Sequence, residues 1–173
     1  MDNLEQKKEP EFLNYVYQLN DGRSLSEAFQ LSIEDIDNLN VSQLKRIGLK
    51  TYAKDKWTIH KIFQHLIDWE RIWCFRAIIF ARNEGTIPVA HDQEVMADNS
   101  SADQRSIDEL IAELRAVRQS TQYLFNSFSD DMLATTCAFF EYQMPLRAIG
   151  LTTTAHQIHH FKVINERYIP LGS

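Results

Sequence analysis

The sequence has little of what secreted, membrane-spanning or nucleic-acid-binding proteins need. It has only two cysteines, Cys74 and Cys137, far apart and outside any Cys-x-x-Cys pattern, which favours a reducing compartment over a disulfide scaffold. The longest unbroken apolar run, Ala77 to Ala81, is too short for a membrane span, and the charged start lacks a signal-peptide stretch. With 18 Lys and Arg against 24 Asp and Glu, the charge is −6, and the basic stripe that phosphate binding needs is missing. We expect a soluble, cytoplasmic protein with no nucleic-acid or membrane partner.

Glycine and proline are scarce as well, and their scarcity bears on the fold. Five glycines and four prolines are too few for an all-β domain, which needs a tight turn every ten or so residues. At 44% hydrophobic and 24% charged, the composition is that of a globular domain. A chain of 173 residues can bury a core without a structural metal, so any bound metal is expected to be functional.

Apolar residues at helical spacing predict four long helices joined without clear strands. The expected N-caps include Ser24, Thr58 and Ser106, and after the two serines a glutamate three residues later completes a capping box. The predicted helices cover residues 24–39, 58–82, 106–128 and 146–169, after a short lead-in helix over 12–19. We therefore predict an all-α fold, a four-helix bundle forming one domain over residues 1–173, with its core at 24–170 and a short N-terminal extension.

Three further segments are interpreted from composition. Residues 41–56 are predicted to be a connector with one helical turn around Gln43. Residues 83–105 show no periodicity, and because so long a loop in a compact domain is more often functional than accidental, we expect it to border the entrance of a site. The charged stretch from Asp108 to Arg118 is predicted to be the solvated face of the third helix.

The histidines carry the main chemical signal. His156 and His160 are four residues apart and so point to nearly the same side of one helix, which is how a helix presents two imidazoles to one metal ion. His65 lies in the middle of the second helix, and three imidazoles converge if the two helices are neighbours. Such a set leaves a coordination position open, as in catalytic zinc sites. The alternative is that these are hydrogen-bonded core histidines. The His-Glu-x-x-His pattern of metalloproteases is absent.

The sequence also resembles the DinB/YfiT-like family of metal-binding four-helix bundles. The resemblance lies in the segment Trp57 to Asp68 (WTIHKIFQHLID), in Arg76, in Val117-Arg118 and in the segment His156 to His160 (HQIHH). It covers nearly the whole chain from Ser24 onward. The resemblance implies that the second and last helices lie side by side and that the metal ligands are the histidine of the His-Leu pair and the two histidines four apart, here His65, His156 and His160.

Neighbouring residues are candidates for supporting the site. Asp68, one turn after His65, could accept a bond from a ligating imidazole, although a surface carboxylate is an equal alternative. Arg76 is only about 20° from the direction of His65 on an ideal helix, so it could hold an anionic group, or it could form a salt bridge inside the bundle. His159 is expected beside the site rather than in it. The expected cofactor is a divalent transition metal, with zinc or nickel first and iron, cobalt or copper as alternatives.

The resemblance implies a metal-dependent enzyme acting on a small molecule. Two reactions fit the family: transfer reactions that use a low-molecular-weight thiol, and hydrolysis. No convincing general base lies on the two predicted metal-bearing helices, which slightly favours activation of a thiol. A non-catalytic metal- or ligand-binding bundle in stress response is the alternative. Bundles with wide apolar stripes often pair, so we also expect a homodimer.

Overall fold

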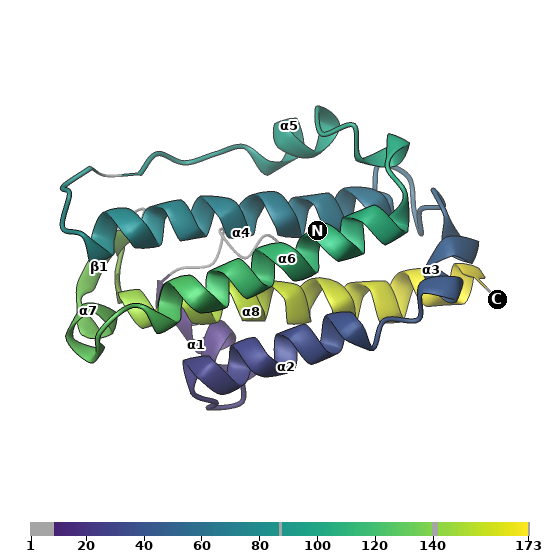
Figure 1. Ribbon diagram of the computed structural model, residues 1–173. Coiled ribbons are helices and arrows are strands. Elements are labelled where there is room, and N and C mark those ends of the chain that lie inside the picture. The colour runs from purple at the N-terminus through teal and green to yellow at the C-terminus, as the bar shows by residue number, and fades with distance from the viewer. Residues whose placement is uncertain (1–8, 87, 140–141, 173) are drawn as a thin grey trace.

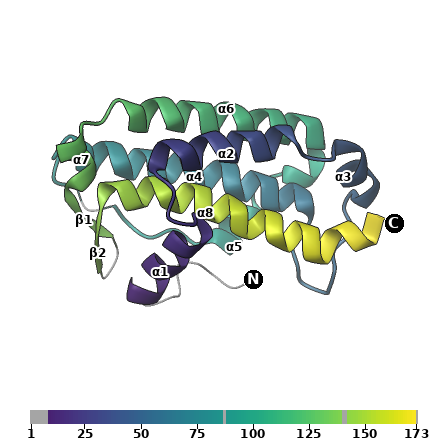
Figure 2. The same cartoon turned by 90° about the horizontal axis from the view of Figure 1, so that it is seen from below.

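The computed structural model describes residues 9–86, 88–139 and 142–172, and within them the all-α prediction is confirmed (Figure 1). Four long helices form a bundle in which α4 and α2 each pack against both α6 and α8 (Figures 1 and 2). Helix α8 runs antiparallel to α4, so the middle of each lies against the middle of the other (Figure 1). The four helices are α2 (Leu25–Asp37), α4 (Ile59–Ala81), α6 (Ile107–Asn126) and α8 (Leu146–Val163).

Local side-chain bonds fix where these helices begin. The side chains of Ser24 and Ser106 each accept a hydrogen bond from the backbone N–H three residues later. The carboxylates of Glu27 and Glu109 accept a hydrogen bond from the backbone N–H of the capping serine. Both predicted capping boxes are therefore present. Thr58 caps α4, also as predicted, by accepting a bond from the first turn at 3.1 Å. Such caps contribute about 1 kcal/mol each, and they are visible in the sequence because both partners are local.

The segments between the long helices contain more regular structure than predicted. The segment 83–105 carries α5 (Gln93–Asp98) and a 3₁₀ turn at Ala102–Gln104, so it is not a structureless loop. Strands β1 (Thr136–Phe139) and β2 (Tyr142–Pro145) form an antiparallel hairpin where no strand was predicted. Elements of three to six residues are too short for periodicity to reveal them. The other short helices are α1 (Glu9–Leu19), α3 (Val41–Ile47) and α7 (Asp130–Ala134).

The last helix ends differently from the prediction of a helix to residue 169. Helix α8 keeps α geometry only to Val163, and a π-helical turn over Ile164–Tyr168 and a 3₁₀ turn over Ile169–Gly172 follow. The buried Tyr168 donates its hydroxyl to the backbone carbonyl of Trp57, just before α4. This bond ties the end of the chain to the start of the helix that carries His65.

The core consists of two apolar clusters separated by a polar layer. On α4, apolar residues within 59–67 belong to one cluster and those within 69–81 to the other. Ala155 on α8 belongs to the second cluster, and Ile164 in the π-helical turn that follows α8 belongs to the first. The buried polar residues near this boundary are Gln64, His65, Glu70, Arg118, Thr152, Thr153, Thr154, His156, Gln157 and His160. The middle of the bundle is therefore polar although it is shielded from water.

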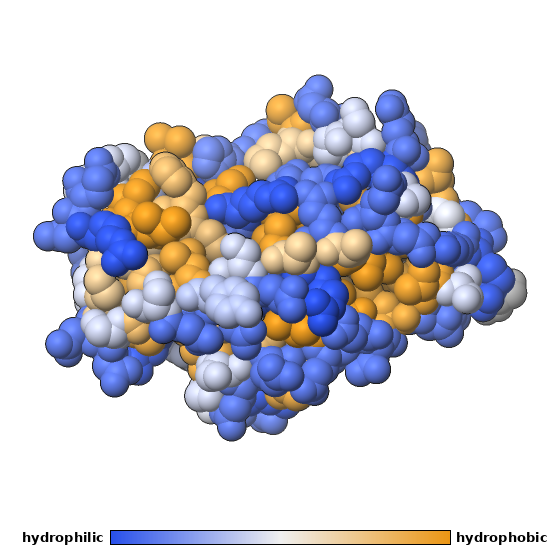
Figure 3. All heavy atoms as spheres, in the orientation of Figure 1, coloured by the Kyte–Doolittle hydropathy of each residue, from blue (hydrophilic) through white to orange (hydrophobic). Residues whose placement is uncertain are grey.

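The surface is mostly polar. In the described ranges no helix has both the length and the apolar character that a membrane span requires. The face drawn in Figure 3 carries an apolar area where the C-terminal half of α4 passes α6. Phe75 and Ile78 are 60% and 41% exposed there, and they line a shallow groove with Val117 of α6.

Candidate metal centre

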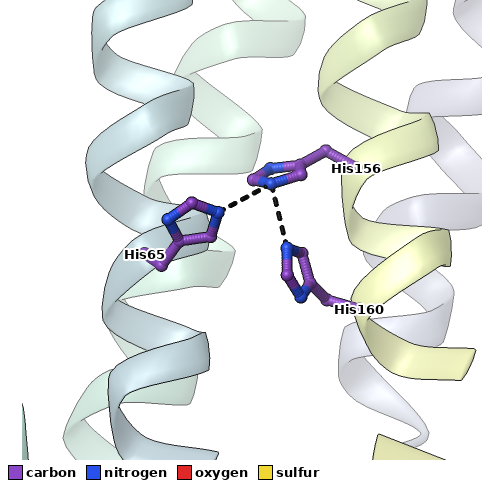
Figure 4. Close-up of side chains that lie close together, drawn as sticks. All are labelled: His65, His156 and His160. Atoms are coloured by element: carbon purple, nitrogen blue, oxygen red, sulfur yellow. Dashed lines mark hydrogen bonds between the residues drawn. The ribbon is translucent and has the colours of Figure 1, made fainter. Parts of the chain in front are cut away.

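Three buried histidines from two helices meet in the polar layer. His65 lies on α4, and His156 and His160 lie one turn apart on α8 (Figure 4). The Nε2 atom of His156 is 2.9 Å from Nε2 of His65 and 3.0 Å from Nε2 of His160. All three side chains are buried. The spacing of four places two imidazoles on one side of α8, and the packing of α4 against α8 brings the third opposite them.

Burial keeps the three imidazoles neutral. Desolvation lowers the pKa of His65 to about 3, and repulsion from nearby His159 acts in the same direction. The pKa values of His156 and His160 lie well below the ordinary range, first because burial disfavours the charged form and second because neighbouring imidazoles repel it. Neutral imidazole is the form that ligates metal ions. The cluster is therefore in the protonation state that a metal site requires.

The contacts among the three nitrogens suit a metal better than hydrogen bonding. Nε2 of a neutral imidazole has one N–H or one in-plane lone pair, so His156 can form one good hydrogen bond there although two nitrogens lie within reach. Nδ1 of the buried His160 has no hydrogen-bond partner among the described residues. A metal at about 2.0–2.1 Å from each nitrogen would hold neighbouring nitrogens roughly 2.8–3.4 Å apart, for coordination angles from 90° to tetrahedral. The two spacings at His156 fall in this range, and the ligand atoms of all three histidines lie within 4.8 Å of one another, so the donor set fits a divalent metal.

The cluster is limited to three side chains in the described part of the chain. No cysteine, aspartate or glutamate of these residues joins the histidines to form a larger set of possible ligands. Three nitrogen ligands on rigid helices leave one or more coordination positions for water or substrate, whereas structural metal sites are closed by four protein ligands. The arrangement is therefore of the open kind.

All three tryptophans of the chain surround the histidines. The ring centres of Trp57 and Trp69 lie 4.8 and 6.1 Å from that of His65, and the ring centre of Trp73 lies 4.9 Å from that of His156. Helical spacing alone predicts Trp69 and Trp73 only as core residues. Their rings exclude water from the imidazoles, which strengthens electrostatic interactions inside the site.

The carboxylate of Asp68 is hydrogen-bonded to a glutamine rather than to a histidine among the described residues. Its carboxylate accepts a bond from Nε2 of Gln64 at 2.8 Å, and Oε1 of Gln64 accepts a bond from Arg105 at 2.6 Å. Burial raises the pKa of Asp68. This residue therefore belongs to a polar network that links α4 to the end of the 83–105 segment.

Arg76 and His159 lie close to the centre without entering it. Arg76 is buried, its guanidinium lies 5.7 Å from the centre of the Trp69 ring, and its Nη2 donates to the carbonyl of Val89 at 3.0 Å. Arg76 thus fastens the 83–105 segment over the tryptophan that contacts His65. Nδ1 of His159 is 2.8 Å from the hydroxyl of Tyr15 on α1. His159 therefore turns to α1 although it is next to His160 in the sequence.

A buried ion pair was missed by the sequence analysis. Nε and Nη2 of Arg118 donate to the two carboxylate oxygens of Glu70 at 2.8 to 3.1 Å, and both side chains are at most 2% exposed. The prediction that the stretch Asp108 to Arg118 is wholly solvated is therefore wrong at its last residue. The available signal was the spacing of Arg118, four residues after Leu114, which places it on the buried face of α6.

Comparisons with known proteins agree with this architecture. The profile of the DinB superfamily matches residues 24–164. The solved structure of YfiT from Bacillus subtilis, described as "a probable metal-dependent hydrolase with an unusual four-helix bundle topology", matches with a TM-score of 0.61 and 16% sequence identity, covering 94% of this chain and 90% of YfiT. No curated protein matches the chain in sequence. The likeness to YfiT confirms the predicted four-helix bundle fold.

Proposed function

The chain belongs to the DinB superfamily, and on that basis we propose that it is a metal-dependent enzyme whose divalent ion is held by His65, His156 and His160. The observation that carries this proposal is the convergence of three neutral, buried imidazoles without a fourth ligand among the described residues. When bound in an open site of this kind, a divalent ion acts as a Lewis acid and lowers the pKa of a ligating water or thiol toward neutrality.

The residues around the histidines have supporting roles in this proposal. The rings of Trp57, Trp69 and Trp73 exclude water from the ligands. Tyr15 holds the ring of His159 beside the site. Arg76 holds the 83–105 segment near the Trp69 ring, and the ring centre of His91 in that segment lies 6.4 Å from that of Trp69. These contacts support a position for the segment at the border of the site.

Two reactions on a small molecule fit the site, and the chain's own residues bear on both. Hydrolysis is favoured by the described activity of YfiT. Transfer to or from a low-molecular-weight thiol is favoured by the ligand set, because no carboxylate stands beside the three histidines in the described ranges to act as general base. We therefore propose a hydrolase or a thiol-dependent transferase. The alternative of a non-catalytic metal- or ligand-binding bundle in stress response is disfavoured by the open coordination.

Several further assignments complete the proposal. Zinc and nickel suit an all-imidazole site, and iron, cobalt and copper remain alternatives. We propose that residues 1–173 form one domain and that the protein acts in the cytoplasm, since both cysteines are free thiols. A homodimer is also proposed, and the exposed Phe75 and Ile78 beside the α4–α6 groove support it.

Elemental analysis of protein purified without a metal-binding tag tests the metal site. We expect about one equivalent of metal per chain in the wild type and loss of that metal in the alanine variants of His65, His156 and His160. His159→Ala is the matched control, because it removes an adjacent imidazole that lies outside the cluster, and it should keep the metal. Retention of metal in His156→Ala would contradict the assignment.

Activity assays of the loaded protein then separate the reactions. Ester and amide probes report hydrolysis, and an electrophilic aryl halide with a small thiol reports transfer. Loss of either activity in His156→Ala, with retention in the Gln30→Ala surface variant, would support an enzyme. A loaded protein that is inactive in both assays would favour the non-catalytic alternative.

A further inference from the structure

The buried pair Glu70–Arg118 links three helices of the bundle, including both that carry the histidines. Glu70 belongs to α4 and Arg118 to α6, and Nη2 of Arg118 also donates to the backbone carbonyl of Thr153 on α8 at 3.1 Å. The bidentate part of the contact fixes the guanidinium plane relative to α4. The bond to Thr153 joins this plane to the backbone of α8 rather than to a mobile side chain. One guanidinium thus sets the position of α8 relative to α4.

This link lies close to the histidine cluster along both helices. Glu70 is five residues after His65, about 7.5 Å along the axis of α4, and Thr153 is three residues before His156, about 4.5 Å along α8. Because the two helices are antiparallel, both displacements point toward the same end of the bundle (Figure 1). The link and the histidine cluster are therefore neighbouring layers of the same helix pair.

Stability alone does not account for this pair. Two buried charges lose so much hydration that apolar residues of similar volume are often equally good or better for stability. Hydrogen bonds also replace the lost hydration only in part, since Nη1 of Arg118 has no hydrogen-bond partner among the described residues. What an apolar pair cannot supply is a directional bond that fixes the register of two helices.

We propose that Glu70 and Arg118 are positioning residues for the three-histidine site, a role that rests on the proposed metal-binding function. They hold α4 and α8 in the register at which His65 meets His156 and His160. Functional ligands must stay within about 0.5 Å of their working geometry, and a slip of one helix by a single residue moves a ligand by about 1.5 Å. Residues that orient metal ligands typically change metal affinity by about 10- to 100-fold when replaced.

The test is to replace the pair by apolar residues and to measure the metal site separately from folding. The double variant Glu70→Leu/Arg118→Met keeps the volume and leaves no unpaired charge. The conservative variant Arg118→Lys keeps the charge but cannot hold both carboxylate oxygens and the Thr153 carbonyl in one plane. The matched control is Lys45→Gln/Asp108→Asn, which removes an ion pair between α3 and α6 whose members are about half exposed.

The readouts are the urea midpoint of the apoprotein, the dissociation constant for Co²⁺ and the visible spectrum of the Co²⁺ form. We expect the double variant to unfold at a similar or higher urea concentration, to bind Co²⁺ about 10- to 100-fold more weakly and to have an altered visible spectrum. Arg118→Lys should show a smaller loss, and the control should match the wild type. A folded double variant with wild-type affinity and spectrum would overturn the proposal.

A general loss of stability must be distinguished from a change of register. Leu114→Ala removes a buried apolar side chain one turn from Arg118 and serves as the destabilised reference. If Co²⁺ affinity falls equally in Leu114→Ala and in a similarly destabilised Arg118→Lys, the positioning role is wrong. If the wild type lacks a Co²⁺ site that depends on His156, the proposed metal function fails, and the positioning role fails with it. Wild-type binding with an unaffected double variant rejects the positioning role alone.

Discussion

Gly150 on α8 lies against side chains of α2 and α6, and its replacement by alanine tests how tightly the bundle is packed. A Cβ atom at this position would lie 2.7 Å from Cδ1 of Leu25 and 2.9 and 3.1 Å from Cε1 and Cδ1 of Phe125. Carbon atoms in contact ordinarily stand about 3.5–4.0 Å apart. The substitution therefore requires a neighbour to move.

The magnitude follows from which neighbour can move. Leu25 is only partly buried at the start of α2, so its terminal methyl can rotate away. Phe125 is 1% exposed, and its ring centre lies 5.6 Å from that of Phe29 and 5.4 Å from that of Phe128, so it has no free space. Overpacking costs about 1–3 kcal/mol, whereas alanine gains about 1 kcal/mol over glycine in helix propensity. Because the rigid ring is one of the two obstacles, we expect a net loss of about 1–2 kcal/mol.

Urea unfolding of the apoprotein measures this loss. Gly150→Ala should lower the midpoint without changing the slope, and it should lower the melting temperature by roughly 2–8 °C for a chain of this size. In a Phe125→Leu background the obstacle is smaller, so the same substitution should become neutral or stabilising. A Gly150→Ala variant that is more stable than the wild type, as helix propensity alone predicts, would refute the close packing of α8 against α6.

Two further predictions concern the metal site and the thiols. Saturating Cu²⁺ should quench most tryptophan fluorescence, since all three indoles lie beside His65 or His156. Zn²⁺, whose d shell is filled, should not quench it. Fluorescence that Cu²⁺ leaves unchanged would count against the site. Burial raises the pKa of Cys74 to about 11, so in a Cys137→Ala background its alkylation by iodoacetamide should be slow at neutral pH and rise toward about pH 11. A titration with its midpoint near pH 8.5 would show that the half-buried Cys74 thiol is not shielded from water.

The parts of the fold that were predictable from sequence are those set by local interactions. The starts of α2, α4 and α6 follow from Ser24, Thr58 and Ser106, because each cap bonds to a group within three residues. The hairpin of Thr136–Phe139 with Tyr142–Pro145 was missed because four residues give no readable alternation, and its pairing is set by packing on the bundle.

The candidate site likewise has a part set by local interactions, which the sequence reveals, and a part set by tertiary packing. The pairing of His156 with His160 is a property of one helix, so the spacing reveals it. The approach of His65 is a tertiary fact, and in the sequence only the resemblance to the DinB family supplied it. The buried position of Arg118 was missed because a charged residue in a charged stretch is ordinarily solvated, and Glu70, its partner, is 48 residues away.

Helix α8 satisfies its buried hydroxyl groups and its buried imidazoles in different ways. It is buried on nearly all sides from Leu146 to Gln157, yet it carries a run of three threonines. The hydroxyls of Thr152 and Thr153 donate to carbonyls four and three residues earlier on α8, both at 2.7 Å, so these two polar groups are satisfied within the helix. Nδ1 of His160 makes no such bond, and it has no hydrogen-bond partner among the described residues. His156 and His160 contact each other through Nε2, and the group that α4 places against His156 is the imidazole of His65, which offers a ligand atom rather than a charge or a hydroxyl. Three ligand atoms that face one another in a layer shielded from water are the arrangement that the proposed metal site requires.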